Sequence, residues 1–320
     1  MLSPNIIKTL SFTASRDWWY RIRFSIAGLQ SVSSDLGDGT TMHCWIPKVH
    51  QQTKPNLILV HGFGANAMWQ YCDILDQFIP KYNVYVPDLL FFGRSYTTLN
   101  ERTETFQAKC LMKLMNIHGV HKLSFVGISY GGFVCYSMAV QFPEAVEKAV
   151  FCCTGVCLEE KDLQEGLFKV RDLEEAGKIL MPQTPDMLRE LMKLSFVKPP
   201  KAVPDWILTD FINIMCKKYV KEKRELIEEI LKNRQLSTLP KISHRTMIIW
   251  GEQDQIFPIE LGYRLQRHVG SNAQLVVIKN AGHAVNLEKS REFVKHLKVF
   301  LIDPPPKPLA KDPTTIEWWN

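Results

Sequence analysis

Short apolar runs alternate with longer segments of helical periodicity along most of this chain of 320 residues. The apolar runs are punctuated by glycine or proline and are predicted to be buried strands at residues 57–62, 83–88, 122–127, 147–153, 246–251 and 274–279. Residues 41–47 alternate polar with apolar side chains, which predicts an edge strand. Helical periodicity covers residues 66–79, 103–118, 130–142, 258–269 and 288–301. This alternation predicts an α/β fold with a mostly parallel, doubly wound sheet.

One long segment interrupts the alternation of strands and helices. Residues 158–240 contain no convincing strand and carry three helical patterns, at 172–180, 184–196 and 204–231, separated by prolines. We therefore expect an all-helical insertion that caps a core formed by residues 40–157 and 241–302.

The two ends of the chain differ in composition from the core. Residues 1–39 form an N-terminal arm that mixes serine, arginine and aromatic residues before the first predicted strand. Such an arm is typical of a transit segment, of a membrane-surface helix or of a segment packed across the domain. The apolar area of Trp18, Trp19 and Tyr20 favours packing. The proline-rich tail at 303–320 is predicted to be extended.

Composition and charge exclude several classes of protein. Hydrophobic residues make up 46% and charged residues 22% of the chain, which is ordinary for a globular protein. The net charge is +6, but the lysines and arginines are interspersed with acidic residues along the chain. No basic stripe results, so no nucleic-acid partner is expected. The longest apolar run is too short to span a bilayer, so we expect no stable membrane insertion.

The eight cysteines lack paired spacing and lie mostly in apolar runs. We expect buried free thiols in a reducing, cytoplasmic setting, with no metal and no other cofactor.

The stretch Gly127-Ile128-Ser129-Tyr130-Gly131 has the pattern G-x-S-x-G between a predicted buried strand and a predicted apolar helix. A serine in front of a helix is often only a cap. Here the glycines permit a sharp strand-to-helix turn that presents the serine hydroxyl, so we predict that Ser129 is a nucleophile.

A serine nucleophile needs a base to remove its proton, and the base needs a carboxylate to orient it. His283 follows the last predicted strand in a glycine-containing loop, whereas His61 sits in a turn that favours a structural role. Asp254 follows the strand at 246–251, with Glu252 as its local competitor. The order Ser129, Asp254, His283 therefore predicts a catalytic triad.

With these residues in place, the sequence resembles the serine hydrolases of the α/β-hydrolase fold with a helical cap. The similarity runs from about residue 40 to 302 and includes the segments VHGFGANAMW, VPDLLFFGRS, GISYGG, WGEQDQIFP and AGHAVNLEKS. The resemblance implies an oxyanion hole made by the backbone N–H groups of Phe63 and Tyr130.

The resemblance also narrows the chemistry. Epoxide hydrolases and haloalkane dehalogenases of this superfamily carry aspartate where this chain has Ser129. With serine at this position, the resemblance implies an esterase that cleaves a small hydrophobic ester through an acyl-enzyme. Carbon–carbon hydrolases of ring-cleavage products share the triad, but many have tryptophan after the histidine, where this chain has Ala284. An acyltransferase and a ligand receptor built on the same fold also remain open.

We expect the substrate pocket to be apolar and partly formed by the helical insertion. Seven aromatic or sulfur-containing side chains are candidates for its wall: Met68, Trp69, Phe91, Phe133, Phe168, Trp206 and Phe211. The sequence leaves the oligomeric state open.

Overall fold

A nine-stranded sheet runs through the centre of the computed structural model, which describes residues 11–170, 172–232 and 234–302. The strands are β1 (Leu29–Gly37), β2 (Thr40–Pro47), β3 (Asn56–Val60), β4 (Asn83–Pro87), β5 (Tyr96–Thr97), β6 (Leu123–Ile128), β7 (Val146–Cys152), β8 (Arg245–Gly251) and β9 (Ala273–Ile278). Their order is β1-β2-β4-β3-β6-β7-β8-β9, with β5 paired to β2. From β4 to β9 every pair is parallel, whereas β1, β2 and β5 pair antiparallel. The predicted doubly wound α/β fold is confirmed.

Two expectations about the N-terminal end of the sheet were wrong. Residues 29–37 were assigned to the arm but form β1, joined to β2 by a hairpin whose turn has positive φ at Gly37, Asp38 and Gly39. β2 was expected at an edge, yet it lies between β1 and β4. β1 escaped prediction because most of its side chains are exposed and polar, so it has no apolar run.

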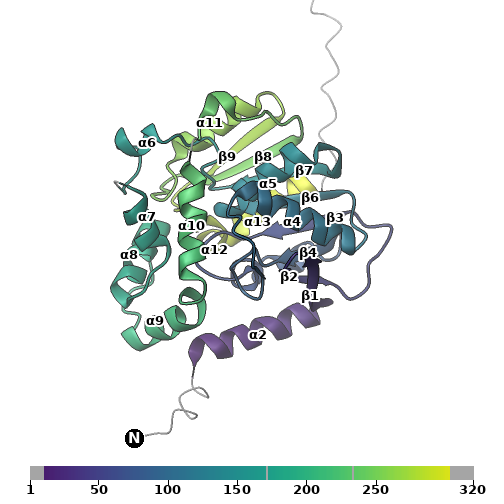
Figure 1. Ribbon diagram of the computed structural model, residues 1–320, viewed down its shortest axis with the longest axis horizontal. Helices are drawn as coiled ribbons and strands as arrows, with labels where there is room; N and C mark the ends of the chain where they lie inside the picture. Colours follow the sequence, from purple (N-terminus) through teal and green to yellow (C-terminus); the bar gives the residue numbers. More distant parts are fainter. Residues whose placement is uncertain (1–10, 171, 233, 303–320) are drawn as a thin grey trace, which may run out of the picture.

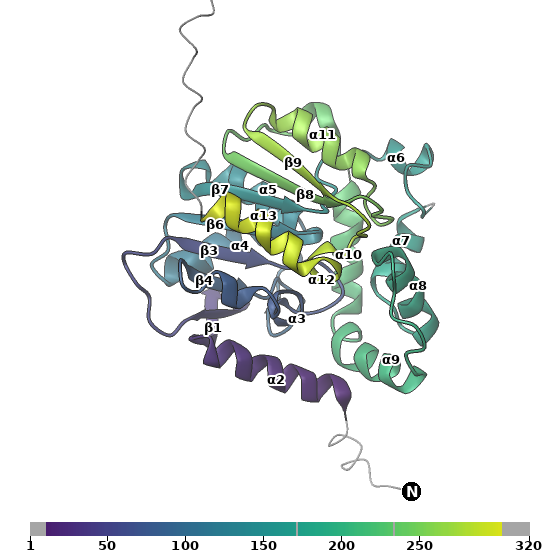
Figure 2. The same cartoon turned by 180° about the vertical axis from the view of Figure 1, so that it is seen from behind.

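Helices cover both faces of the sheet. They are α2 (Phe12–Ile26), α3 (Ala67–Tyr71), α4 (Glu104–Ile117), α5 (Tyr130–Gln141), α11 (Ile259–Val269), α12 (Val285–Glu288) and α13 (Ser290–Leu301), with short 3₁₀ turns η1 (Leu75–Gln77) and η2 (Pro143–Ala145). Helices α4 and α5 lie in front of the sheet in Figure 1, and α3 and α13 lie in front when it is seen from behind in Figure 2. Thr103 begins α4 by accepting a hydrogen bond from the backbone N–H of Phe106.

Between β7 and β8 the described residues form helices and turns but no strand, as expected. They are α6 (Lys161–Gln164), α7 (Leu173–Leu180), α8 (Pro185–Ser195), α9 (Asp205–Phe211), the π-helical turn η3 (Ile212–Cys216), α10 (Val220–Leu231) and the 3₁₀ turn η4 (Leu236–Thr238). The long pattern at 204–231 is broken at Tyr219, which has a left-handed backbone with φ 57°. These helices lie to one side of the sheet (Figure 1). Their assignment as a cap over residues 40–157 and 241–302 stays a proposal.

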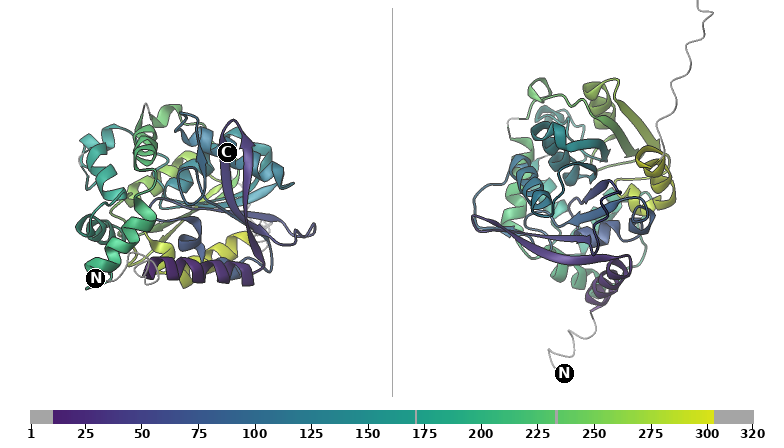
Figure 3. Two further views of the ribbon diagram at one scale, coloured as in Figure 1. Left: turned by 60° about the horizontal axis from the view of Figure 1, so that its bottom comes forward. Right: turned by 90° about the vertical axis from the view of Figure 1, so that its right-hand side faces the viewer.

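The N-terminal arm continues as helix α2, which packs along the outside of the domain (Figure 3). Tyr20 and Phe24 on its inner side are buried. The expectation that the arm packs through its aromatic residues was wrong for Trp18 and Trp19, whose exposed fractions are 63% and 48%. The first ten residues and the tail at 303–320, predicted to be extended, lie outside the described residues. No helix among those described has the length and apolarity needed to cross a membrane.

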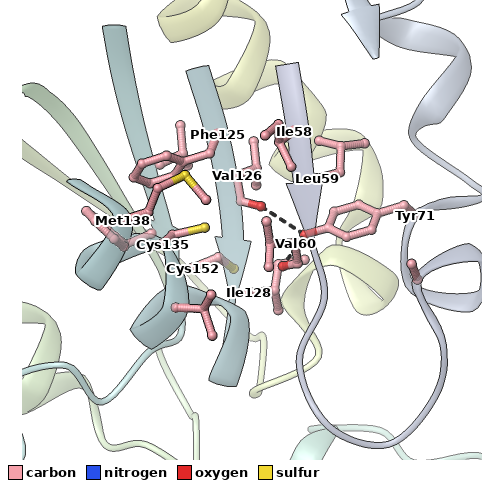
Figure 4. Packing of buried hydrophobic residues seen from close by; sticks show 14 of the residues in the cluster. Ile58, Leu59, Val60, Tyr71, Phe125, Val126, Ile128, Cys135, Met138 and Cys152 are labelled. Atoms are coloured by element: carbon pink, nitrogen blue, oxygen red, sulfur yellow. Dashed lines mark hydrogen bonds between the residues drawn. The ribbon is translucent and has the colours of Figure 1, made fainter. Parts of the chain in front are cut away.

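The core beneath the β6–α5 junction is filled by buried apolar side chains. Figure 4 shows Val60 of β3 and Val126 of β6 among the apolar side chains that fill it. The buried hydroxyl of Tyr71, at the end of α3, approaches the carbonyl oxygens of Val60 at 2.8 Å and of Val126 at 3.1 Å. Burial raises the pKa of the Tyr71 phenol well above its usual value, so this group remains a donor. Tyr71 thereby ties α3 to two neighbouring strands.

We expect Tyr71→Phe to lower the free energy of unfolding by about 1–3 kcal/mol, because the buried carbonyl oxygens of Val60 and Val126 would lose this donor. Urea unfolding followed by circular dichroism measures the change. Tyr263→Phe is the control, since Tyr263 is 44% exposed and should lose little. Equal stability of the two variants would contradict this role of Tyr71.

Candidate active site

Ser129 lies at the sharp junction between β6 and α5, as the G-x-S-x-G pattern predicts. Its backbone has φ 53° and ψ −121°, a conformation that a non-glycine residue adopts at a cost of about 1–3 kcal/mol. The turn is held by hydrogen bonds from Ser129 N–H to the Cys152 carbonyl at 2.8 Å and from Gly132 N–H to the Ser129 carbonyl at 2.9 Å. A Cβ atom at Gly131 would lie 2.4 Å from the carbonyl oxygen of Val60. The glycine is therefore required where this turn crosses β3.

His283 reaches Ser129 from the loop that follows β9. Its Nε2 lies 2.9 Å from Ser129 Oγ, and its Nδ1 lies 2.8 Å from Asp254 Oδ2. The second oxygen of Asp254 accepts hydrogen bonds from the backbone N–H groups of Ile256 and Phe257, both at 2.9 Å. These bonds fix the carboxylate so that it can orient the imidazole. The structure thus places the three predicted side chains in one continuous hydrogen-bonded line.

Glu252, the alternative carboxylate, does not join this line. It is exposed, and its Oε2 accepts a hydrogen bond from the backbone N–H of Asn280 at 3.1 Å. The side chain of Asp254, in contrast, is fully buried beside His283.

The histidine loop is supported from two sides. The backbone N–H of Ala284 donates to the carbonyl of Ser195, at the end of α8, at 2.9 Å, so the helical insertion contacts the loop directly. On the other side the ring of Phe257 lies 5.7 Å from the His283 ring, centroid to centroid. Phe133 and Phe168 pack against Phe257 at 5.9 and 6.3 Å. The imidazole therefore rests against an aromatic cluster.

The loop after β3 passes directly against Ser129. A Cβ atom at Gly62 would lie 2.7 Å from Ser129 Cβ, which leaves room only for glycine. Gln70 holds the loop by accepting from the N–H of Gly62 and donating to the carbonyls of Gly62 and Phe63. The rings of Phe63 and Tyr130 pack edge to face at 5.1 Å. The two residues expected to form the oxyanion hole thus contact each other through their rings.

His61 has the structural role that its turn suggested. Its Nε2 accepts from the backbone N–H of Leu89 at 3.0 Å, which leaves Nδ1 to donate to the carbonyl of Gly62 at 2.7 Å. Burial lowers the pKa of His61 and keeps the ring neutral in this arrangement. The ring thus links the loop after β3 to the loop after β4.

The structure contains a second hydrogen-bonded set of serine, histidine and aspartate side chains, which the sequence did not indicate. His43 of β2 lies 2.8 Å from Asp88 and 2.7 Å from the hydroxyl of Ser31. Burial acts to raise the pKa of Asp88, but the hydrogen bond and charge of His43, the charge of His61 and the backbone N–H of Ala67 together lower it. Ser31 sits in regular strand β1, without the turn and cavity that Ser129 has, so we regard this set as structural.

An apolar cavity of about 350 Å³ opens beside Ser129 and His283. Trp69 and Phe211 line it, as expected, and their rings pack edge to face at 5.5 Å. Most of the remaining wall comes from the loop after β3, the helical insertion and the histidine loop: Gly62, Phe63, Gly64, Ala65, Gln70, Ile128, Leu180, Leu188, Leu191, Met192, Ser195, Phe196, Pro200, Ile207, Leu208, Ala284, Asn286 and Leu287. Phe12 and Thr13 of α2 complete it, and no sequence signal pointed to these two.

Five of the seven candidate pocket residues lie elsewhere, so those expectations were wrong. Met68 and Phe91 line a separate polar cavity of about 170 Å³, and Phe168 lines a small apolar cavity of about 80 Å³. Phe133 belongs to the cluster behind Phe257, and Trp206 is 61% exposed on α9. Apolar character alone did not distinguish the cavity wall from the layer behind it.

All eight cysteines are buried and free, as predicted. One of them, Cys153, offers a donor atom within 4.8 Å of those of Asp254 and His283. Burial raises the pKa of the Cys153 thiol well above its usual value, whereas a metal ligand must be a thiolate. The donor chemistry thus suits a hydrogen-bonded triad better than a metal centre.

Comparison with known proteins identifies the family and the fold. A family model described as alpha/beta hydrolase fold matches residues 55–290. Monoacylglycerol lipase ABHD6 of Mus musculus is 28% identical over 262 residues, which cover 78% of this chain and 76% of the relative. A 2-hydroxy-6-oxononadienedioate/2-hydroxy-6-oxononatrienedioate hydrolase of Pseudomonas sp. is 24% identical over 77% of this chain and 87% of its own length. The crystal structure of a putative lipase from Acinetobacter baumannii superposes with a TM-score of 0.76 at 22% identity, covering 89% of this chain and 95% of that one.

We expect Gly131→Ala to destabilise the fold by about 1–3 kcal/mol, because the added methyl group would meet the backbone of β3. The matched control is Gly177→Ala in α7, where the nearest atom would be a methionine methyl at 3.7 Å. There the same change should stabilise the helix by about 0.5–1 kcal/mol. Urea unfolding of both variants tests the opposite signs. A Gly131→Ala variant as stable as the original chain would disprove the close approach.

Proposed function

The chain belongs to the α/β hydrolase fold family, and we propose that it is a serine hydrolase that cleaves a carboxylic ester of a small hydrophobic substrate. The observation that supports this most is the hydrogen-bonded line from Ser129 through His283 to Asp254, with bonds of 2.9 and 2.8 Å, at the wall of an apolar cavity. The names of the relatives, which include lipases, also support a hydrolase of the lipase and esterase type.

In the proposed mechanism Ser129 Oγ attacks the ester carbonyl carbon while His283 Nε2 takes its proton. Asp254 keeps the imidazole oriented and stabilises its positive charge. The backbone N–H groups of Phe63 and Tyr130 bind the tetrahedral oxyanion, each contributing about 3 kcal/mol to lowering the barrier. His283 then gives the proton to the leaving alcohol, and a water molecule activated by the same nitrogen releases the acid from Ser129.

The cavity favours an uncharged, apolar acyl group. Among the described residues that line it there is no lysine or arginine, and most of the wall is aliphatic or aromatic. An acyl chain buried there gains roughly 0.8 kcal/mol per methylene group. The name of the mammalian relative, a monoacylglycerol lipase, supports an ester of this kind.

Carbon–carbon bond hydrolysis is the second candidate, because the Pseudomonas relative is named for a dienedioate substrate. A substrate with two carboxylates would need cationic partners near the reacting carbon. Here Arg94, Lys218 and Lys223 line the neighbouring polar cavity instead, and Ala284 follows the histidine. We therefore rank ester hydrolysis first. An acyltransferase would need an acceptor that outcompetes water, and a receptor would turn over once or not at all.

We also propose a reducing, cytoplasmic setting for the protein. The eight free thiols, all buried without pairing, support it.

Ser129→Ala should abolish turnover of p-nitrophenyl esters and covalent labelling by a fluorophosphonate probe, because the nucleophile is gone. Asp254→Asn should lower kcat by about 10⁴-fold while the fold persists, because the histidine would lose its orienting acceptor. The control is Ser195→Ala, which removes another serine from the same cavity and should leave labelling intact. Full labelling of the Ser129 variant would refute the mechanism, and single-turnover kinetics in the original chain would favour a receptor.

Chain-length selectivity tests the acyl position. Leu191→Trp narrows the cavity, so kcat/KM for octanoate and longer esters should fall about tenfold relative to the acetate ester. Leu99→Trp, at a partly exposed position away from the cavity, is the control. An equal loss for short and long esters would contradict the assignment of the cavity as the acyl site.

A further inference from the structure

Helix α2 is apolar on the side that faces solvent. Phe12, Trp18, Trp19 and Ile26 have exposed fractions of 47%, 63%, 48% and 80%. Together with the half-buried Ile22 they form what we call the outer face of α2, because their spacing places them on one side of the helix. The opposite side carries the buried Thr13, Tyr20 and Phe24. A surface helix of a globular protein normally turns polar side chains outward, so the outer face needs another explanation.

Arg16 is exposed and has no carboxylate partner among the described residues. The other two arginines of the helix are paired with acids, Arg21 with Asp17 and Arg23 with two aspartates below the helix. The helix contains Arg16, Arg21 and Arg23 and a single acid, Asp17. Asp17 turns inward, where Arg21 and the Trp69 ring nitrogen donate to it at 2.9 and 3.2 Å.

The contact between the Arg23 guanidinium and the Trp19 ring suits a layer of lipid headgroups. The Arg23 guanidinium lies 5.0 Å from the ring centroid of Trp19, and it also pairs with Asp73 and Asp76 below the helix. Tryptophan beside arginine is the combination found where an apolar side chain enters the layer of lipid headgroups.

The outer face is continuous with the mouth of the apolar cavity. Phe12 belongs to both, and Leu287, which also lines the cavity, is 44% exposed. The first turn of α2 is fixed to the helical insertion, because Thr13 N–H and Ser11 Oγ both donate to Asp210 of α9, at 2.8 and 3.0 Å. Figures 1 and 2 show α2 and α9 meeting at one end of the molecule, with no other labelled element beyond α2.

We propose that the outer face of α2 binds the surface of an anionic lipid bilayer, with the helix lying in the headgroup layer and the cavity mouth beside it. A second copy of the chain fits less well, since this strip is roughly 22 Å long and 10 Å wide. A stable protein interface buries about 800 Å² on each partner. The exposed Arg16, which no carboxylate among the described residues neutralises, is complementary to an anionic headgroup. This binding does not rest on the proposed chemistry at Ser129.

Co-sedimentation of the full chain with vesicles tests the proposal. We expect binding to phosphatidylcholine vesicles that contain about 30% phosphatidylglycerol, and weaker binding to phosphatidylcholine alone or in high salt. The double variant Trp18→Ser/Ile26→Ser should bind at least about tenfold more weakly, because it removes two side chains that would enter the lipid. Its thermal unfolding and its turnover of a water-soluble acetate ester should match those of the original chain.

Two controls separate this surface from general stickiness and from catalysis. Ile117→Ser/Tyr263→Ser removes two exposed apolar side chains elsewhere, with exposed fractions of 50% and 44%, and should keep vesicle binding. Ser129→Ala should lose turnover and keep binding, so the two proposals can fail independently. The proposal is overturned if the original chain stays in the supernatant with anionic vesicles, or if the Trp18/Ile26 variant binds equally well. A dimer in light scattering that this variant dissociates would assign the outer face to a second copy instead.

Discussion

The backbone at Ser129 is the constraint on which the candidate site depends. A serine with φ 53° is tolerated there because glycines stand at each place where the turn meets a neighbouring segment. Gly131 permits contact with β3, and Gly62 permits the loop after β3 to lie against the serine itself. Tyr71 then locks β3 to β6 beneath the turn. The strain is thus balanced by the rigidity of the parallel sheet, which holds the hydroxyl at the point that His283 reaches.

The sheet and the triad residues could be predicted from the sequence because their signals are local. A buried parallel strand is a short apolar run, and a residue directly after such a run must emerge at the carboxyl edge of the sheet. Asp254 and His283 follow two such runs, so their meeting with Ser129 needed only the topology. β1 is the counterexample: its stability comes from pairing with β2, and its own exposed, polar side chains gave no signal.

The wall of the cavity could not be predicted in the same way, because an apolar side chain is equally suited to a wall and to the layer behind it. Phe133 and Phe168 illustrate this, since both pack on Phe257, and it is Phe257 that contacts the ring of His283. Met68 and Trp69 are adjacent in α3, yet they face different cavities because successive residues of a helix point about 100° apart. Which apolar side chains line the cavity depends on how distant segments pack, including α2, which contributes Phe12 and Thr13 to the wall.

Helix α2 shows most clearly that apolar character does not reveal which side of a helix is buried, since aromatic residues occur on both of its sides. Tyr20 is buried while its neighbour Trp19 is half exposed, although the sequence offers a large aromatic side chain at each position. Packing against the domain can satisfy only one side of a single helix, so the outer side must meet water or another apolar phase. Exposed tryptophan is costly in water, and the cavity is lined by the first turn of α2, at Phe12 and Thr13. For the proposed binding of apolar esters, a cavity mouth gains most where such molecules are concentrated. The orientation of one short helix can therefore couple access of the substrate to the surface on which the protein rests.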